Sequence, residues 1–261
     1  MPLYEQQSVT DCFTAWKMAE TRVSSLPPYA AHRRVGMEVL AKNGSLAKQV
    51  EDEIRNRIVF GQIELGSRIS EKHLADSLEV SKTPVRNALL RLQDEDLVEI
   101  KPQKGTMVCK PDVLQFQNVS LVRTVLEPVA FACAYRESYD VFLADLKAVY
   151  LDMDESMGCQ DYNAYILQDL RFHDLFFEHS HNPYLKKSYL LIRSMLAILR
   201  VQLTRNEKHL KKSYVEHSSI IAHIENRDCE SALEILDGHI SFNNRSYWSD
   251  ISGIVQRMYD K

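Results

Sequence analysis

The sequence predicts a mainly α-helical protein with one small β-hairpin, divided into two parts. Only 8 of the 261 residues are glycine, and from Leu46 onward apolar residues recur at the spacing of helix faces. One short stretch departs from this pattern, because β-branched residues alternate on both sides of KPQKG at 101–105. Past Asp112 the helical pattern is unbroken. We therefore expect a small mixed domain followed by an all-helical one.

Three boundaries divide the chain. Residues 1–44 contain Pro27 and Pro28 and close on the turn-forming AKNGS. This pattern predicts an N-terminal extension and does not indicate whether the extension is ordered or disordered. Residues 45–111 then form the mixed domain, residues 112–250 the all-helical domain, and residues 251–261 a C-terminal tail.

The composition narrows the class of protein. The formal net charge is −4, so any nucleic-acid surface must be local rather than spread over the chain. The 5 cysteines form no C-x-x-C pair and leave one unmatched, which favours reduced thiols. The start, MPLYEQQSVT, lacks the pattern of a secretory signal, and no apolar stretch approaches the roughly 20 residues that a bilayer requires. We expect a cytoplasmic protein without a membrane partner.

The mixed domain opens with three predicted helices. Ser45 can cap the first, whose apolar positions recur every fourth residue up to the stop at Gly61. Ser70 can cap a short second helix, EKHLADSL, which ends at the break Glu79-Val80. The third helix follows at once, with Val85, Leu89 and Leu92 on its inner face. Helix, helix, turn, helix and hairpin together predict a winged helix-turn-helix.

The outer face of the third helix is cationic and can donate hydrogen bonds. Pro84 is tolerated in the first turn, so the positive end of the helix is available to a phosphate. A major groove admits one α-helix, and arginine or lysine with guanine and asparagine with adenine are favoured pairings. The predicted DNA-binding set is Ser81, Lys82, Thr83, Arg86, Asn87 and Arg91, with Gln103, Lys104 and Gly105 from the wing. The alternative is a solvated charged helix, but such a helix does not predict the elements around it.

Helical periods in the second domain cover 114–138, 141–157, 161–180, 184–205, 213–226 and 229–247. Asp169 and His173 are four residues apart, so both can reach one cation from the same helix face. His217 and His239 are separated by the same number of residues from Asp228, which lies at the break between their helices. In an antiparallel helical hairpin, this equal separation places the two residues side by side. The four would suit Zn, Ni, Mn or Fe(II). From spacing alone, the alternative that each histidine is separately hydrogen-bonded stays open.

The mixed domain resembles the GntR family of bacterial transcriptional regulators. The resemblance rests on G-x-x-x-x-G-x-x-I-S-E at 61–71, V-S-K-T-P-V-R at 80–86 and K-G at 104–105, and it extends from Ser45 to Val108. Three positions depart from the family pattern: Lys82 stands where arginine is common, Asn87 where glutamate is common and Asp96 where a glycine usually precedes L-V.

The helical domain resembles the FCD class of the FadR subfamily, which implies an all-α bundle for effector binding and dimerisation. The resemblance implies a metal site made of Asp169, His173, His217 and His239. It also implies an effector site that includes Arg123 and Asn182, the latter in the H-N-P-Y turn. The alternative for Arg123 is a plain salt bridge with Glu127. One position departs from the FCD pattern: Ser218 stands where an arginine often follows the histidine that matches His217.

Together these features predict a ligand-responsive transcriptional regulator that represses a catabolic operon. One short helix makes few base contacts, so we expect a homodimer on an inverted-repeat operator. The cofactor would be a divalent metal ion and the effector a small organic acid. The rival predictions are a metal-dependent hydrolytic enzyme carrying a DNA-binding head, for which spacing places no separate acid or base beside the metal, and a protein-binding module.

Overall fold

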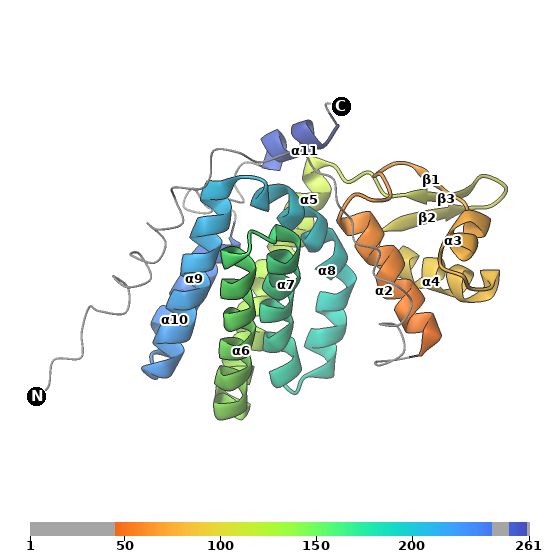
Figure 1. Ribbon diagram of the computed structural model, residues 1–261. Helices are drawn as coiled ribbons and strands as arrows, with labels where there is room; N and C mark the ends of the chain where they lie inside the picture. Colours follow the sequence, from red (N-terminus) through yellow and green to blue (C-terminus); the bar gives the residue numbers. More distant parts are fainter. Residues whose placement is uncertain (1–44, 242–250, 260–261) are drawn as a thin grey trace, which may run out of the picture. The chain divides into compact units, whose positions relative to one another are not determined.

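The computed structural model describes residues 45–241 and 251–259 (Figure 1). The predicted extension 1–44 and the end of the predicted helix 229–247 lie outside the described residues. Among the described helices, none combines the length and the apolar content that crossing a bilayer requires.

The mixed domain has the predicted elements and one strand more. Its helices are α2 (Leu46–Val59), α3 (Glu71–Ser77) and α4 (Lys82–Asp94), and its strands are β1 (Arg68–Ile69), β2 (Val98–Lys101) and β3 (Gly105–Val108). The antiparallel sheet has the order β1-β3-β2. Ile54, Val85 and Leu89 are fully buried between the helices and the sheet. The hairpin wing is therefore confirmed, and a two-residue strand completes it.

The cap of α3 and the turns on either side of α4 determine where α4 lies. Ser70 accepts a hydrogen bond from the His73 amide at 3.3 Å and so caps α3 as predicted. Glu79 takes a φ of +55° in the turn between α3 and α4. Asp96, where glycine is usual in the family, takes a φ of +56° before β2. Aspartate is among the few side chains that enter this left-handed region, so the turn forms without glycine.

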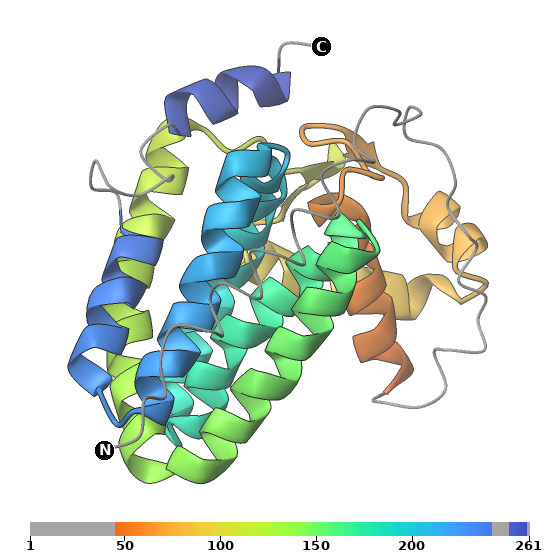
Figure 2. The same ribbon diagram turned by 60° about the vertical axis from the view of Figure 1, so that its left-hand side comes forward.

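The helical domain follows the predicted order. Its helices are α5 (Val113–Glu137), α6 (Tyr139–Gly158), α7 (Tyr162–His179), α8 (Pro183–Thr204), α9 (Glu207–Glu225) and α10 (Cys229–Ile240). Helix α9 begins six residues before the predicted start, because Asn206 caps it and its lysine-rich first turns carry little apolar signal. Helix α5 packs against α7, α8 and α10 (Figure 2). Phe131, Phe142 and Phe176 meet edge to face in the core beside these helices.

The predicted C-terminal tail contains a helix, α11 (Ile251–Tyr259), which packs against α5 and α8. Ile251 and Ile254 are buried there. The Tyr259 hydroxyl donates to the Pro111 carbonyl at 2.9 Å, and the Lys110 ammonium lies 4.4 Å from the centre of the Tyr259 ring. Helix α11 therefore contacts the segment that joins the mixed domain to the helical domain.

Candidate nucleic-acid interface and metal centre

The outer face of α4 is exposed as predicted. Val85, Leu89 and Leu92 point into the core, which turns the polar side chains outward. The exposed residues of the predicted set are Ser81, Lys82, Thr83, Arg86, Asn87 and Arg91. The Arg86 side chain is 71% exposed, and its nearest carboxylate, that of Glu71, lies 3.9 Å away. Such a weak surface pair leaves the guanidinium available to another anion.

Arg91 differs from the rest of this face. Its Nη1 lies 3.1 Å from Oε2 of Glu51 on α2. Arg91 stands at the edge of the exposed face, beside α2, and its charge is partly matched within the domain. Arg86 and Asn87 are therefore better placed than Arg91 to contact a groove.

The wing tip carries the other predicted residues. Gln103 and Lys104 are exposed in the turn between β2 and β3, and Gln103 takes a φ of +64°. A Cβ on Gly105 would lie 3.1 Å from Nη2 of Arg68, so glycine lets the exposed Arg68 side chain lie against the turn. Arg68 adds a cation to the wing that sequence reasoning missed, because a two-residue strand shows no alternation.

The structure brings the four predicted ligand residues together in the interior of the helical domain. Asp169 and His173 come from α7, His217 from α9 and His239 from α10. All four are buried, and one ligand atom from each lies within 4.8 Å of the others. Nε2 of His173 lies 3.4 Å from Nε2 of His217 and 3.3 Å from Nε2 of His239. Three ring nitrogens therefore converge on one point.

Carboxylates behind two of the rings determine which nitrogens converge. Nδ1 of His173 lies 2.8 Å from Oε2 of Glu127, and Nδ1 of His239 lies 2.9 Å from Oε2 of Glu216. Each Nδ1 donates its proton to a carboxylate, so the lone pair of each ring is on Nε2, toward the centre. Such carboxylate–histidine pairs orient metal-binding histidines in proteins.

Burial keeps the three rings neutral. It lowers the pKa of His217 to about 3, and it lowers the pKa values of His173 and His239 well below the ordinary histidine value. The positive charges of Arg200 and Arg123 lower the pKa of His173 further. Neutral imidazoles are the form that binds a metal ion.

Asp169 supplies the charged oxygen of the cluster. Its Oδ2 lies 3.1 Å from Nη1 of Arg200 on α8, and its Oδ1 accepts from the Ser213 hydroxyl at 3.3 Å. Burial alone would raise the pKa of Asp169, but the positive charge of Arg200, together with that of Arg123, outweighs it and holds that pKa below its usual value. Asp169 is therefore an anion inside the domain. One carboxylate with three neutral imidazoles can coordinate a divalent cation.

Arg123 lies beside this cluster and is fully buried. Its Nε donates to Oε1 of Glu127 at 2.6 Å, so the salt bridge weighed as an alternative is present. Its Nη2 also lies 3.2 Å from Nε2 of His173, at the point where the rings converge. Burial raises the pKa of Glu127, while Arg123 and Arg200 oppose that rise. Arg123 is thus both an ion-pair partner and a neighbour of the ligand cluster.

Asn182 is not brought to this cluster. It is the N-cap of α8, and its Oδ1 accepts hydrogen bonds from the amides of Tyr184 and Leu185. Arg200 lies near the other end of the same helix, about 27 Å away along its axis. The predicted effector role of Asn182 therefore has no support from its position, and a capping residue before Pro183 accounts for the H-N-P-Y turn.

Two residues of the cluster lay outside the predicted set. The sequence pattern did not indicate a role for Arg200, because a single arginine in a predicted helix is usually exposed on the surface. Glu216 precedes His217 directly, and neighbours in a helix point in different directions, so its contact with His239 depends on how α9 packs on α10.

The fold defines a class: a winged-helix transcriptional regulator with an all-helical second domain. Residues 46–108 match the family model described as bacterial regulatory proteins, gntR family, and residues 118–242 match the FCD domain. The chain belongs to the GntR family and carries an FCD domain. The members of this family that it matches are transcriptional regulators rather than enzymes, so the hydrolytic alternative is not supported.

Individual relatives agree with this placement. The chain is 25% identical over 220 residues to a gluconate operon transcriptional repressor of Bacillus licheniformis, covering 82% of this chain and 87% of that protein. It is 30% identical over 125 residues to an uncharacterized HTH-type transcriptional regulator of Agrobacterium vitis, covering 46% of this chain and 72% of that protein. The solved structure of E. coli McbR/YncC shares the fold, with a TM-score of 0.67, 22% identity and coverage of 84% of this chain and 100% of that chain.

Proposed function

We propose that this regulator is a homodimeric repressor of a catabolic operon, which binds an inverted-repeat operator and releases or tightens its hold when a metal-bound organic acid occupies the helical domain. The observation that carries the proposal is the combination of an exposed cationic face on α4 with a buried set of converging ligand atoms. The name of the Bacillus licheniformis relative favours repression over activation.

The metal part of the proposal rests on the donor set. Asp169, His173, His217 and His239 would hold a divalent cation, since one ring nitrogen of each histidine and one carboxylate oxygen lie close together. Zinc, nickel, manganese and iron(II) all accept such ligands. When bound, the metal would supply a positive centre for a carboxylate oxygen of the effector.

The effector part rests on the two guanidinium groups beside the cluster. Nη2 of Arg123 lies 3.2 Å from Nε2 of His173, and Nη1 of Arg200 lies 3.1 Å from Asp169. A small organic acid at the metal would meet Arg123 and exchange part of its pairing with Glu127 for the new carboxylate. The chemistry fits an anion and does not define its carbon skeleton.

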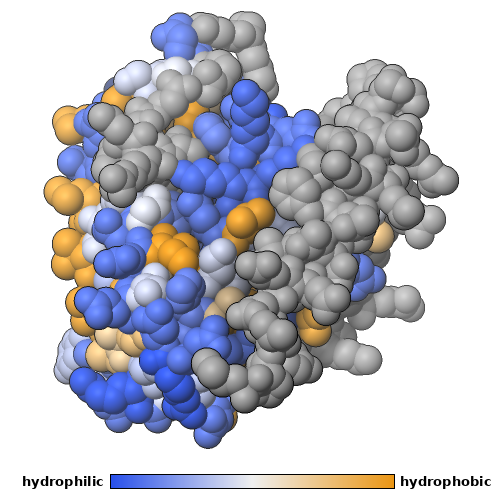
Figure 3. Space-filling model, turned by 90° about the vertical axis from the view of Figure 1, so that its left-hand side faces the viewer, coloured by the Kyte–Doolittle hydropathy of each residue, from blue (hydrophilic) through white to orange (hydrophobic). Residues whose placement is uncertain are grey.

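The dimer part rests on an apolar stripe along α5. Leu121, Val125 and Val129 follow one another at intervals of four residues, and the side chains of the first two are 64% and 61% exposed. Figure 3 shows apolar side chains gathered along one edge of the face it draws, on the side where α5 lies in Figure 2. Contiguous exposed apolar residues mark interaction surfaces, and a second copy would cover the stripe with its own α5.

Two measurements test the proposal. Filter binding with genomic DNA fragments at low and raised salt should show retention that falls steeply with salt, because phosphate contacts release counterions. Elemental analysis should find a divalent metal in the purified protein and lose it in His173→Ala combined with His217→Ala. His223→Ala, a half-exposed histidine of α9 that pairs with Asp228, is the control. Absence of DNA retention, or equal metal content in the double variant, contradicts the proposal.

A further inference from the structure

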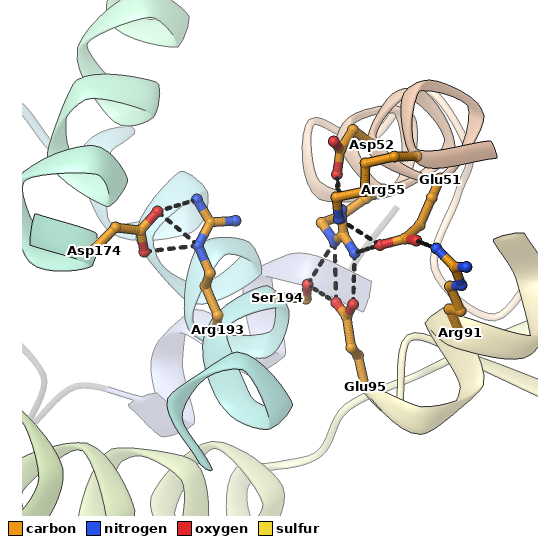
Figure 4. Close-up of polar contacts among 9 residues, drawn as sticks. Glu51, Asp52, Arg55, Arg91, Glu95, Asp174, Arg193 and Ser194 are labelled. Atoms are coloured by element: carbon orange, nitrogen blue, oxygen red, sulfur yellow. Dashed lines mark hydrogen bonds and ion pairs between the residues drawn. The ribbon is translucent and has the colours of Figure 1, made fainter. Parts of the chain in front are cut away.

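The two domains meet at a group of polar side chains that we call the Arg55 cluster: Arg55, Glu51, Glu95 and Ser194 (Figure 4). Nε of Arg55 donates to Oε2 of Glu95 at 3.0 Å and lies 3.1 Å from Oγ of Ser194. Nη2 of Arg55 donates to Oε1 of Glu95 at 2.5 Å, and the Ser194 hydroxyl also donates to Glu95. One serine of the helical domain therefore touches both members of an ion pair in the DNA-binding domain.

This contact is nearly closed to solvent. The side chains of Arg55 and Glu95 are 8% and 16% exposed, and Ser194 is 1% exposed. Hydrogen bonds to charged groups are strong where water is excluded, and a partner left unmatched there is costly. The cluster therefore fixes a defined geometry, unlike a solvated surface ion pair.

The cluster is joined directly to the helix that carries the DNA-binding face. Glu95 is the residue that follows Asp94, the last of α4. Further back on α4, Arg91 pairs with Glu51, which also accepts from Nη2 of Arg55 at 2.6 Å. The last turn of α4 is thus held at two points, and a shift of the cluster moves this helix.

The cluster is joined to the ligand site through α8. Ser194 and Arg200 stand on that helix about 9 Å apart along its axis, and Arg200 contacts Asp169 of the ligand site. Beside Ser194, Arg193 donates three hydrogen bonds to the carboxylate of Asp174 on α7, at 2.8, 3.0 and 2.6 Å (Figure 4). Helix α7 also carries Asp169 and His173, so a shift of α8 against α7 changes contacts at the Arg55 cluster and at the ligand site.

A cavity beside the cluster leaves room for such a shift. It has a volume of about 350 Å³ and is lined from both domains, by Lys48 and Asp52 on one side and Lys186 and Leu190 on the other. Tight packing resists small displacements, whereas a cavity next to a polar contact permits a second arrangement.

We propose that Ser194 and Glu95 are a positioning pair that couples occupancy of the ligand site to the pose of α4. The inference rests on the proposed function, since it requires a DNA-binding domain that responds to a bound metal. A change at the Asp169–Arg200 contact moves α8, and Ser194 passes the movement to Glu95. Coupling of this kind is reciprocal, so DNA must change metal affinity by the same factor.

The test compares the parent protein with Ser194→Ala and Glu95→Gln. Both variants leave Arg55 paired with Glu51 and Asp52, and Glu95→Gln keeps the shape of the side chain. Ser188→Ala, an exposed serine on the same helix, is the matched control. Fluorescence anisotropy measures the affinity for a duplex selected from random sequence by the parent, with each protein either loaded with Zn²⁺ or stripped by a chelator. Zn²⁺ stoichiometry is measured in parallel.

We expect Zn²⁺ to change the duplex affinity of the parent and of Ser188→Ala by a factor in the range of about 5–150. In Ser194→Ala and Glu95→Gln this factor should fall toward one while Zn²⁺ still binds at the parental stoichiometry. A parental factor in both variants overturns the positioning role. A factor of one in a parent that binds both Zn²⁺ and duplex also overturns it. A parent that binds no duplex or no Zn²⁺ overturns the proposed function itself.

Discussion

Oε2 of Glu216 lies 2.9 Å from Nδ1 of His239, and this contact directs the opposite ring nitrogen toward the other two imidazoles. We expect Glu216→Ala to lower Zn²⁺ affinity about 10–100-fold, because the ring loses the acceptor that fixes its tautomer and orientation. Competition with a chromophoric chelator measures the change. Glu225→Ala removes a carboxylate from the last turn of the same helix, where it pairs with Lys147 at the surface, and should leave the affinity unaltered. Equal affinity in both variants would show that Glu216 does not orient a ligand.

Arg86 tests the exposed face of α4. Arg86→Ala should weaken binding to an operator duplex by about 1–3 kcal/mol and flatten its salt dependence, because a cation that meets the duplex is lost. Gel-shift titrations at several salt concentrations give both quantities. Arg136→Ala removes the same charge from the end of α5 and is the control. If Arg86→Ala matches the parent in affinity and slope, another surface reads the DNA.

Val125 tests the apolar stripe on α5. If the proposed dimer forms through this stripe, Val125→Asp should make the protein monomeric, since an aspartate facing its own copy would have to be desolvated without a partner. Sedimentation velocity distinguishes the two states. Leu151→Asp introduces the same charge at an exposed leucine of α6 and should remain dimeric. A dimeric Val125→Asp protein would place the interface on another face.

Glu51 gives the fold a defined response to acid. Burial alone would raise its pKa, but hydrogen bonds from Lys48, Arg55 and Arg91 outweigh it and lower the pKa from 4.5 to about 2. A carboxyl with a lowered pKa in the folded state stabilises the fold fully above its unfolded pKa, near 4.5, and this contribution is lost as the pH falls toward 2.

The difference in unfolding free energy between the parent and Glu51→Gln should therefore shrink between about pH 6 and about pH 3. Urea titrations followed by circular dichroism measure it. Glu53→Gln, which changes a more exposed acid on the same helix, is the control. A difference that stays constant with pH would mean that Glu51 is not held ionised by its three neighbours.

Much of the fold was predictable because its signals are local. The spacing of Val85, Leu89 and Leu92 was enough to orient α4, since the face opposite three core residues must be exposed. The level placement of His217 and His239 followed from a short break between two helices that pack on each other. Spacing did not decide between a shared cluster and separate histidines, because that depends on how α7 meets α9 and α10.

The remaining features depend on tertiary contacts. Strand β1 is too short to alternate, and it exists because Arg68 and Ile69 pair with β3. The sequence pattern predicts a tail over 251–261, whereas helix α11 forms there and buries Ile251 and Ile254. Asn182 was assigned to an effector by resemblance, whereas its Oδ1 caps α8. In the first two cases the role is set by a neighbour distant in sequence, whereas the cap that Asn182 forms is local.

The hydrogen bond from Tyr259 to the Pro111 carbonyl ties the last described helix to the joint between the domains. The C-terminal helix and the segment that joins the two domains are thereby held to each other. We expect removal of α11 to disturb the segment that joins the two domains, because that segment loses its contacts with Tyr259. A change in operator affinity after α11 is removed would show that DNA binding depends on this distant end of the chain.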